Sequence, residues 1–218
     1  MKKFLMLFSI LLLGITLSGS KVNIKTDTVK IIHTNYTSTF SKSKRYPVMV
    51  EWWITKEKIN CDTPLKRKDN FKPDPLLPRY TNLINDYKNS GYDRGHMMPA
   101  AENLCQTPHI QDECFYFSNM SPQDHNLNAG DWKSLEELER KLSLEKDSVH
   151  IWCGNVGEVK KIGSVSVPEK CWKVLYVVKT KKWMSFLFVN NNSFPDGIEN
   201  NKVDIKVLET LTGFKFIK

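Results

Sequence analysis

The chain contains 218 residues, of which 40% are hydrophobic and 26% are charged. A chain of this length and composition can bury a core as one domain, which excludes a disordered or low-complexity protein. The formal charge of +8 indicates a polyanionic partner, although a solvated lysine surface produces the same excess. Only five of the 32 basic residues are arginine, so we expect several of them where lysine would not serve. They are Arg45, Arg67, Arg79, Arg94 and Arg140.

The N-terminal residues 1–20 have the pattern of a secretory signal. Lys2 and Lys3 precede a nearly unbroken apolar run at 4–17, and small residues follow it. This run is shorter than the roughly 20 residues of a membrane-spanning helix, so a cleaved signal is favoured over an anchor. We therefore predict a secreted or periplasmic protein with no stable membrane association. Its mature domain, 21–218, loses two lysines and keeps a charge of +6.

All five cysteines lie in the predicted mature part, where an exported chain can form disulfides. They are Cys61, Cys105, Cys114, Cys153 and Cys171. Because the number is odd, at least one is free or pairs between chains. Cys105 with Cys114, and Cys153 with Cys171, are the pairings we consider. Zinc is disfavoured, because the spacing of its possible ligands matches no strong template. Those ligands would be Cys105, His109, Cys114 and His125.

The first part of the mature chain favours strands. Residues 29–40 alternate loosely and are rich in Thr, Tyr and Ile, which predicts an antiparallel strand, and a second strand is expected at 48–55. The passage at 61–78 is polar and rich in proline. It has neither a helical nor a strand period, so it is expected to form an ordered loop or a surface excursion.

The segment 92–99 combines an acid, a guanidinium and an imidazole on a constrained backbone. Gly95 allows a turn or a close approach beside His96, and Pro99 should end any strand or helix. Imidazole takes up a proton near neutral pH, and the planar guanidinium of Arg94 suits phosphate. A base beside a phosphate-binding group is what phosphodiester hydrolysis requires. Alternatively, Asp93 and Arg94 form only a surface ion pair and His96 is an ordinary loop histidine.

The central part of the chain predicts a buried strand, a loop and a helix. The strand is expected at 115–119, a turn at 120–123 and a polar loop at 124–130. A helix at 131–146, with Asp131 as N-cap, has an apolar stripe made of Trp132, Leu135, Leu138 and Leu142. Four further residues are spaced by four, so those on the helix lie near one side of it. They are Asn128, Trp132, Glu136 and Arg140. Alternatively, Glu136 and Arg140 form only a surface ion pair.

The remaining chain predicts strands at 149–153, 172–179 and 184–189. A short helix at 204–211 is expected to stop at Gly213. There are no repeats, low-complexity tracts or internal linkers. These elements predict one α+β domain with a central antiparallel sheet.

Several ordered motifs resemble a known family. They are Arg67 with 69–71, the Asp-Arg-Gly-His run 93–96, the block 118–123, residues 127–128 with Trp132, 135–136 and Arg140, and the pairs 167–168 and 172–173. Together these motifs resemble the DRGH-type non-specific DNA/RNA endonucleases, which include secreted bacterial nucleases and mitochondrial endonuclease G. The likeness covers residues 33–216. It implies a ββα-metal (His-Me finger) site, with His96 on the hairpin and the metal on the helix side.

The resemblance also implies catalytic and metal-binding roles. His96 would be the general base that takes a proton from the attacking water. Asn128 would bind one Mg²⁺ directly, for which Mn²⁺ is a possible substitute. Glu136 would hold a metal-bound water, and Arg140 would stabilise that water and the phosphate. Mg²⁺ prefers oxygen ligands and keeps several waters, which agrees with an Asn carbonyl beside a carboxylate.

Four further residues complete the implied site. Arg67 and Arg94 would neutralise charge on the scissile phosphate. Asn119 would support His96 or the metal waters, and Asp93 would brace the loop rather than react. Asn126 is the alternative metal ligand, but the family spacing from Asn to Trp and Glu selects Asn128.

The chain departs from the family pattern in two places. Met97 and Met98 stand where small residues are common after the His. The stretch containing Cys105 and Cys114 is slightly long, which suggests a local disulfide there.

We therefore expect an exported, Mg²⁺-dependent, sugar-non-specific endonuclease that cuts DNA and RNA and leaves 5′-phosphates. A phosphodiesterase of the same fold acting on small nucleotides is one alternative. A surface nucleic-acid-binding protein without catalysis is another, and a structural secreted domain is the third. DNA and RNA are the expected partners, with a protein inhibitor as a possible one. The sequence leaves the oligomeric state and the biological role open.

Overall fold

A central antiparallel sheet organises the fold of the computed structural model, which describes residues 27–146, 148–191 and 194–216. The predicted signal at 1–20 lies outside the described residues. The strand order is β1-β2-β3-β6-β9-β10. These strands are β1 (Thr28–Ile32), β2 (Tyr36–Ser41), β3 (Tyr46–Thr55), β6 (Ser148–Val156), β9 (Lys170–Val177) and β10 (Lys182–Val189). The predicted α+β domain with a central antiparallel sheet is confirmed.

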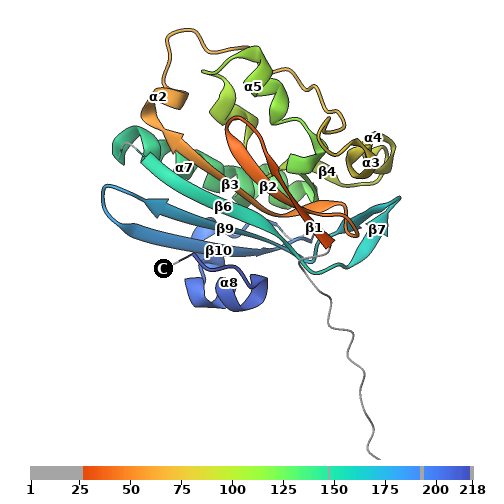
Figure 1. Ribbon diagram of the computed structural model, residues 1–218. Coiled ribbons are helices and arrows are strands. Elements are labelled where there is room, and N and C mark those ends of the chain that lie inside the picture. The colour runs from red at the N-terminus through yellow and green to blue at the C-terminus, as the bar shows by residue number, and fades with distance from the viewer. Residues whose placement is uncertain (1–26, 147, 192–193, 217–218) are drawn as a thin grey trace, which may run out of the picture.

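Helices cover the two faces of this sheet (Figure 1). The long helix α7 (Lys133–Lys146) lies on the inner face, and α8 (Ile205–Thr212) lies on the outer face. The prediction of α8 is confirmed, since Asp204 caps its start by accepting from the Lys206 backbone N–H (2.8 Å) and it ends at Gly213, which has φ 74°. No helix within the described ranges has the length and apolarity that a membrane span requires.

Smaller elements surround the inner face. Two short ribbons are β4 (Asp93–His96) with β5 (Met120–Gln123), and β7 (Lys160–Ile162) with β8 (Val165–Val167). The short α-helices are α2 (Lys56–Ile59), α3 (Pro78–Thr81), α4 (Ile84–Tyr87), α5 (Pro108–Glu113) and α6 (His125–Leu127). The tight turns are η1 (Ala100–Asn103), η2 (Phe117–Asn119) and η4 (Ile198–Asn201), and η3 (Asn128–Trp132) is a π-helical turn.

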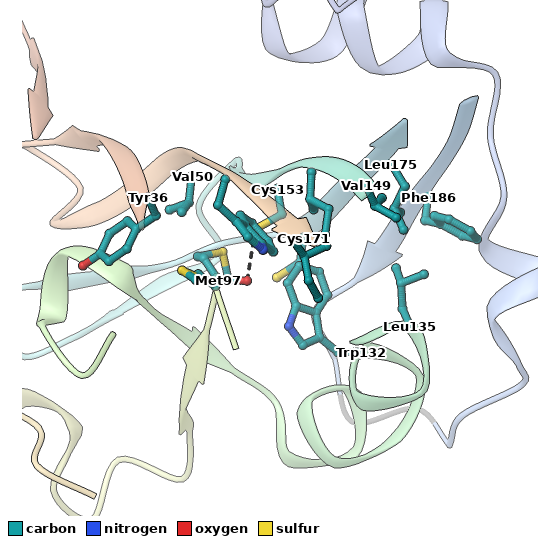
Figure 2. Packing of buried hydrophobic residues seen from close by; sticks show 14 of the residues in the cluster. Tyr36, Val50, Met97, Trp132, Leu135, Val149, Cys153, Cys171, Leu175 and Phe186 are labelled. Atoms are coloured by element: carbon teal, nitrogen blue, oxygen red, sulfur yellow. Dashed lines mark hydrogen bonds between the residues drawn. The ribbon is translucent and has the colours of Figure 1, made fainter. Parts of the chain in front are cut away.

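The main core lies between α7 and the inner face of the sheet (Figure 2). Trp132 and Leu135 are fully buried against the strands, and Leu138 and Leu142 pack there in part. The predicted apolar stripe is therefore confirmed. Met97, which follows β4, belongs to the same core, and its carbonyl accepts from the Cys153 thiol (3.4 Å). Burial of these large side chains fixes the helix and the hairpin relative to one sheet.

The predicted strand at 29–40 is interrupted. β1 and β2 form a hairpin in which Ile32 pairs with Thr37. The turn is held by polar contacts, since the His33 ring meets Asp74 (2.9 Å) and the Thr34 backbone N–H donates to Glu113 (2.9 Å). Asp74 and Glu113 are distant in sequence, so a local pattern does not show that they hold a turn here. The alternation of residue types runs on through the turn, and it therefore predicted one strand instead of two.

The predictions at 115–119 and 120–123 were wrong. Tyr116 makes only an isolated bridge with Lys72, and Phe117–Asn119 is the turn η2. Met120–Gln123, expected as a turn because of its Ser and Pro, is the strand β5 paired with β4. Pro122 lacks a donor but fits here, because a two-stranded ribbon leaves part of its backbone outside the ladder.

The helix that precedes α7 begins earlier than expected. Residues 124–130 were predicted as a loop, but Asp124 caps α6 by accepting from the Asn126 backbone N–H (3.0 Å). Helical structure then continues through η3 into α7, with a kink at Gly130. Asp131 is not the N-cap. It is buried and accepts from the backbone N–H groups of Asp196 (3.3 Å) and Gly197 (3.2 Å).

Both cysteine pairings were wrong. The disulfide joins Cys61 to Cys105, whereas Cys114, Cys153 and Cys171 are buried thiols. Cys153 lies opposite Lys173 in the sheet, so Cys171 is two residues along β9 from the position that faces Cys153. The disfavoured zinc set is not assembled, because Cys105 is in the disulfide and the described residues contain no group of three or more His, Cys, Asp or Glu suited to a metal.

Candidate active site

A cleft of about 300 Å³ opens beside β4, η3 and the start of α7. It is lined by Arg67, Arg94, His96, Pro99, Ala100, Ala101, Asn128, Ala129, Lys133, Glu136 and Arg140. Six of the seven residues that the sequence assigned to catalysis or metal binding are in this lining, and Asn119 is not. Residues far apart in the chain thus meet at one place.

The hairpin holds His96 at the end of β4. His96 pairs with Met120 and Gly95 pairs with Ser121 across the ribbon. Gly95 is needed because a Cβ there would lie 1.9 Å from the Gln123 Oε1 atom, so its close neighbour is the hairpin itself rather than a ligand. The Trp132 indole N–H donates to the His96 carbonyl (3.1 Å), which joins the hairpin to the helix.

The His96 side chain is packed between aromatic rings and is only 8% exposed. The rings of Phe71 and Phe115 lie 5.6 Å and 5.0 Å from its centroid. Burial and then the positive charge of Arg67 lower the His96 pKa to about 3. Its Nε2 is buried and has no hydrogen-bond partner among the described residues. The imidazole is therefore neutral at neutral pH and has a nitrogen available for proton transfer.

Asn119 lies behind His96 and is fully buried. Its side-chain amide donates to the carbonyls of Met98 and Cys114, both at 2.9 Å, and its carbonyl accepts from the Met98 backbone N–H (2.9 Å). Its own backbone carbonyl accepts from the Met97 N–H (2.9 Å). Asn119 thus holds the backbone that follows His96, on the hairpin side of the cleft. Met97 and Met98 are buried, which accounts for large residues at these positions.

Asn128 is oriented by Asp93. Its amide nitrogen donates to the Asp93 carboxylate (2.9 Å), which also contacts the His125 ring (2.9 Å). Because the nitrogen faces Asp93, the carbonyl oxygen of the same amide is directed away from it. Asp93 therefore braces Asn128 rather than its own loop. Asn126 lines a separate pocket of about 200 Å³, which distinguishes it from Asn128.

Glu136 supplies a carboxylate to the same cleft. Burial raises its pKa to about 7, although Lys173 and Arg140 act in the opposite direction. An Asn carbonyl and a carboxylate are the oxygen donors that Mg²⁺ prefers, and a bound cation would offset the desolvation of Glu136. The residues present therefore fit a magnesium ion.

Three of the five arginines line the cleft. Arg67 is about half exposed, with its Nε 2.8 Å from Asp69, and it lies over the Phe115 ring. Arg94 lies over the Phe71 ring at 5.0 Å. The Arg94 Nε and Arg140 Nη1 atoms are buried and have no hydrogen-bond partner within the described part of the chain. Such unpaired guanidinium donors suit an anionic ligand such as a phosphate.

Sequence reasoning missed Lys133, which also lines the cleft. Its position three residues before Glu136 places it on the same side of α7. That spacing was the signal that could have identified it.

A buried charged network behind the cleft was also missed. The Lys173 ammonium lies 2.7 Å from Glu139, and both side chains are fully buried. The Trp52 indole donates to Glu102 (2.6 Å). Burial, and then the charge of Glu139, raise the Glu102 pKa well above its usual range. Two signals in the sequence were available. Glu139 follows Glu136 by three residues and so lies on the same side of α7. Lys173 is a charged residue within a mostly apolar strand.

Comparisons with known proteins identify the family of this chain. A family model described as DNA/RNA non-specific endonuclease matches residues 16–218. The chain is 29% identical to a nuclease of Nostoc sp. over 224 residues, which cover 95% of this chain and 80% of that protein. It is 33% identical to the human mitochondrial nuclease EXOG over 206 residues, which cover 84% of this chain. The match spans about half of the human relative, 55% of its length.

Among solved structures, the chain resembles one from the crystal structure of the EndoG/EndoGI complex. The TM-score is 0.77 at 28% sequence identity, and the match covers 86% of this chain and 84% of that one. The similarity therefore extends over nearly the whole described fold.

Proposed function

The chain belongs to the DNA/RNA non-specific endonuclease family, and from this premise we propose that it is an exported, Mg²⁺-dependent enzyme that hydrolyses phosphodiester bonds in DNA and RNA and leaves 5′-phosphates. One observation carries the proposal. A neutral histidine with an unpartnered nitrogen, three arginines and an Asn–Glu oxygen pair line a single cleft. Each group matches one requirement of phosphodiester hydrolysis.

In the proposed mechanism, His96 accepts a proton from a water molecule as the water oxygen attacks phosphorus. The bond from phosphorus to the 3′-oxygen breaks, the departing 3′-oxygen takes a proton from a water molecule to become a hydroxyl, and the phosphate stays on the 5′-oxygen of the other product. The low pKa of His96 keeps the ring neutral in the resting enzyme, and a bound phosphate would raise that pKa and make the ring a stronger base. Asn119 positions this base through the Met97–Met98 backbone.

Arg67 and Arg94 bind the non-bridging oxygens, and Arg140 stabilises the developing charge from the helix side. Asn128 would hold Mg²⁺ directly and Glu136 would hold it through water, and the ion would supply electrostatic stabilisation of the phosphate. Mn²⁺ also accepts oxygen ligands and is a proposed substitute. Because the arginines contact phosphates rather than base edges, the enzyme would cut without regard to base sequence. Phosphates are common to DNA and RNA, so both would be substrates.

Export is proposed from the N-terminal pattern, and the Cys61–Cys105 disulfide fits an oxidising compartment. A protein inhibitor is a proposed partner, because the similar EndoG structure is a complex with EndoGI that concerns the inhibition of EndoG.

Incubation of the purified protein with supercoiled plasmid and with RNA tests the function. With Mg²⁺ both should be degraded, end analysis should find 5′-phosphates, and EDTA should stop the reaction. Robust cutting in EDTA, or activity on only one nucleic acid, contradicts the proposal. Hydrolysis of a small phosphodiester without nicking of plasmid would indicate the phosphodiesterase alternative. Binding without any hydrolysis would indicate the non-catalytic one.

A further inference from the structure

The outer face of the sheet carries a row of rings that the catalytic cleft does not use. Trp53 on β3 pairs in register with His150 on β6, His150 with Tyr176 on β9, and Tyr176 with Trp183 on β10. Because strands lie about 4.8 Å apart, this row is roughly 14 Å long. β2 begins opposite Trp52, so the row ends at Trp53.

The rings of this row contact one another and a fifth ring, Trp152. Trp53 stacks on His150 at 3.9 Å with an interplanar angle of 18°, and Tyr176 lies 4.5 Å from Trp183. Trp152 joins the two pairs, at 3.7 Å from His150 and 5.8 Å from Trp183. We call these five residues and the hollow of about 530 Å³ that they line the aromatic groove. Trp53 remains 44% exposed, so its ring is open to a ligand.

Lysines lie at the aromatic groove and in the turn of the chain that leads to it. The Lys58 ammonium donates to the Trp53 carbonyl (3.1 Å), and Lys215 lines the groove. The turn that leads to Trp183 carries three exposed lysines. These are Lys179, Lys181 and Lys182.

The carboxylates at the groove are already paired. Glu51 lies 2.9 Å from His150, and Glu209 lies 3.4 Å from Lys215. The pKa of Glu51 is lowered, chiefly by its contact with His150 and further by Lys30. The groove therefore combines flat apolar surfaces with the Lys58 ammonium beside Trp53, whereas Lys215 is paired with Glu209.

We propose that the aromatic groove is a second nucleic-acid site, which binds unpaired bases of single-stranded DNA or RNA. Stacked aromatic side chains beside cationic groups bind single strands without reading sequence, because every base has a face that can stack. Paired bases in a duplex have no free faces, so the site is selective for single strands. The biological use of this site rests on the proposed nuclease function.

The position of the aromatic groove separates it from the cleft. Trp52 and Trp53 are neighbours on β3 and point to opposite faces of the sheet. Trp52 contacts Glu102 behind the cleft, whereas Trp53 faces the groove. A segment bound in the groove is therefore not the one that is cut. The groove anchors a long strand while another part of it occupies the cleft.

A second copy of this chain suits the aromatic groove less well. A two-fold interface places the same surface of each copy against the other. Lysines at the rim would then face the same set of lysines, and the chain as a whole has a charge of +8. The nearby carboxylates are already paired within one copy.

Fluorescence anisotropy in EDTA tests the proposal without any dependence on catalysis. The probes are a fluorescein-labelled thymidine 20-mer and a labelled duplex of equal length. Trp53→Ala should weaken binding of the single strand at least about 5-fold, since one stacking contact contributes on the order of 1–3 kcal/mol. Binding of the duplex should change less than 2-fold. Phe194→Ala, which removes an exposed aromatic ring elsewhere, is the matched control.

Trp53→Phe and Lys58→Gln extend the test to variants that keep the packing. Trp53→Phe should restore most of the affinity, and Lys58→Gln should lower it at low salt only. Equal loss on single strand and duplex, or no loss on either, overturns the proposal. If sedimentation shows that Trp53→Ala dissociates a dimer while affinity for the single strand is unchanged, the groove is instead an interface between copies. A protein that binds through the groove but fails to cut with Mg²⁺ refutes the nuclease function and leaves this inference standing.

Discussion

The two walls of the cleft are built in different ways. One wall, the hairpin–helix wall, consists of β4 with His96 and of η3 and α7 with Asn128 and Glu136. It is tied together by the Trp132–His96 and Asn128–Asp93 hydrogen bonds and by the main core. The other, the loop wall, is the stretch around Arg67 between α2 and α3, which contains no named helix or strand.

The loop wall is held mainly by contacts to the segment 104–117 rather than by pairing in a sheet. The Lys68 backbone N–H donates to Gln111 (3.1 Å), and Leu65 N–H donates to the Leu104 carbonyl (2.6 Å). The Cys61–Cys105 disulfide closes the stretch at its start. Proton transfer and metal binding depend on exact distances, whereas attraction of a phosphate tolerates small displacements. The two walls therefore depend on different contacts: the main core positions the hairpin–helix wall, whereas the disulfide and the segment 104–117 position the stretch around Arg67.

His96→Ala should have the largest effect, because it removes the base from the hairpin–helix wall. Turnover on plasmid with Mg²⁺ should fall by roughly 10²–10⁴. Folding, followed by circular dichroism, and metal binding, followed by calorimetry, should stay close to wild type. Loss of metal binding in this variant would show that His96 is a ligand and that the assignment of the base is wrong.

Asn128→Ala should have the next largest effect. Asn128 is the proposed direct ligand of the metal. Its replacement should lower turnover by at least about 10²-fold and weaken the dependence on Mg²⁺. Asn126→Ala is the matched control, since Asn126 lies in a different pocket. Titration of Mg²⁺ against both variants decides the point. If Asn126→Ala is the inactive one, the assignments of Glu136 and Arg140 lose their support.

Arg67→Ala tests the loop wall and should cost less. The loss of one charged phosphate contact should slow cleavage by about 10-fold on all sequences alike. The slope of log affinity against log salt should become shallower by about 1. Arg79→Ala, which removes an arginine stacked on Tyr80 outside the cleft, should change neither quantity. A defect that depends on sequence would instead assign Arg67 to base contacts.

Replacement of both Cys61 and Cys105 by serine should loosen the loop wall alone. KM should rise several-fold, while turnover at saturating substrate should change less than in Arg67→Ala. The disulfide closes a loop with a sequence separation of 44, so its loss should cost up to about 4 kcal/mol of stability. Thermal melting and steady-state kinetics measure the two effects. An unchanged KM would mean that the disulfide stabilises the fold without ordering Arg67.

The smallest effect concerns the pH dependence of stability in EDTA. Because the Glu136 pKa is raised to about 7, the native state retains a proton that the unfolded chain has lost. This contribution to stability is full below the ordinary pKa of Glu, about 4.3, and is lost as pH rises through 7. Glu136→Gln should remove a shift in Tm on the order of 5–10 °C between pH 5 and 8. Glu137→Gln, at an exposed neighbour, should retain it.

The residues that the family resemblance assigned to the site line one cleft, whereas the secondary structure around them was predicted less well. His96, Asn128 and Glu136 were selected by matching ordered motifs, which do not depend on assigning each segment to a strand or a helix. The strands β3, β6, β9 and β10 were also predicted, whereas β1 and β2 were predicted as one strand. β5 was missed because Ser121 and Pro122 are common in turns, and only pairing with β4 makes them a strand. Local patterns carry no record of such a partner.

The cysteines and the buried network show the same limit. The partner of Cys61 depends on how α2 and η1 meet, which no spacing encodes. Lys173 and Glu139 are both fully buried in contact with each other, although each alone resembles a solvated charge. Each of these errors concerns a contact between residues that are far apart in the sequence.

The Cys61–Cys105 disulfide also has a consequence for the cell that makes the protein. In a reducing cytosol the two thiols would stay separate, so the stretch that carries Arg67 would lose its covalent link to Cys105. Under the proposed export, the nuclease would bind nucleic acid less effectively before it leaves the cell than afterwards. Oxidation on the far side of the membrane would complete the loop wall, which would delay full activity until the producer's own DNA and RNA are out of reach.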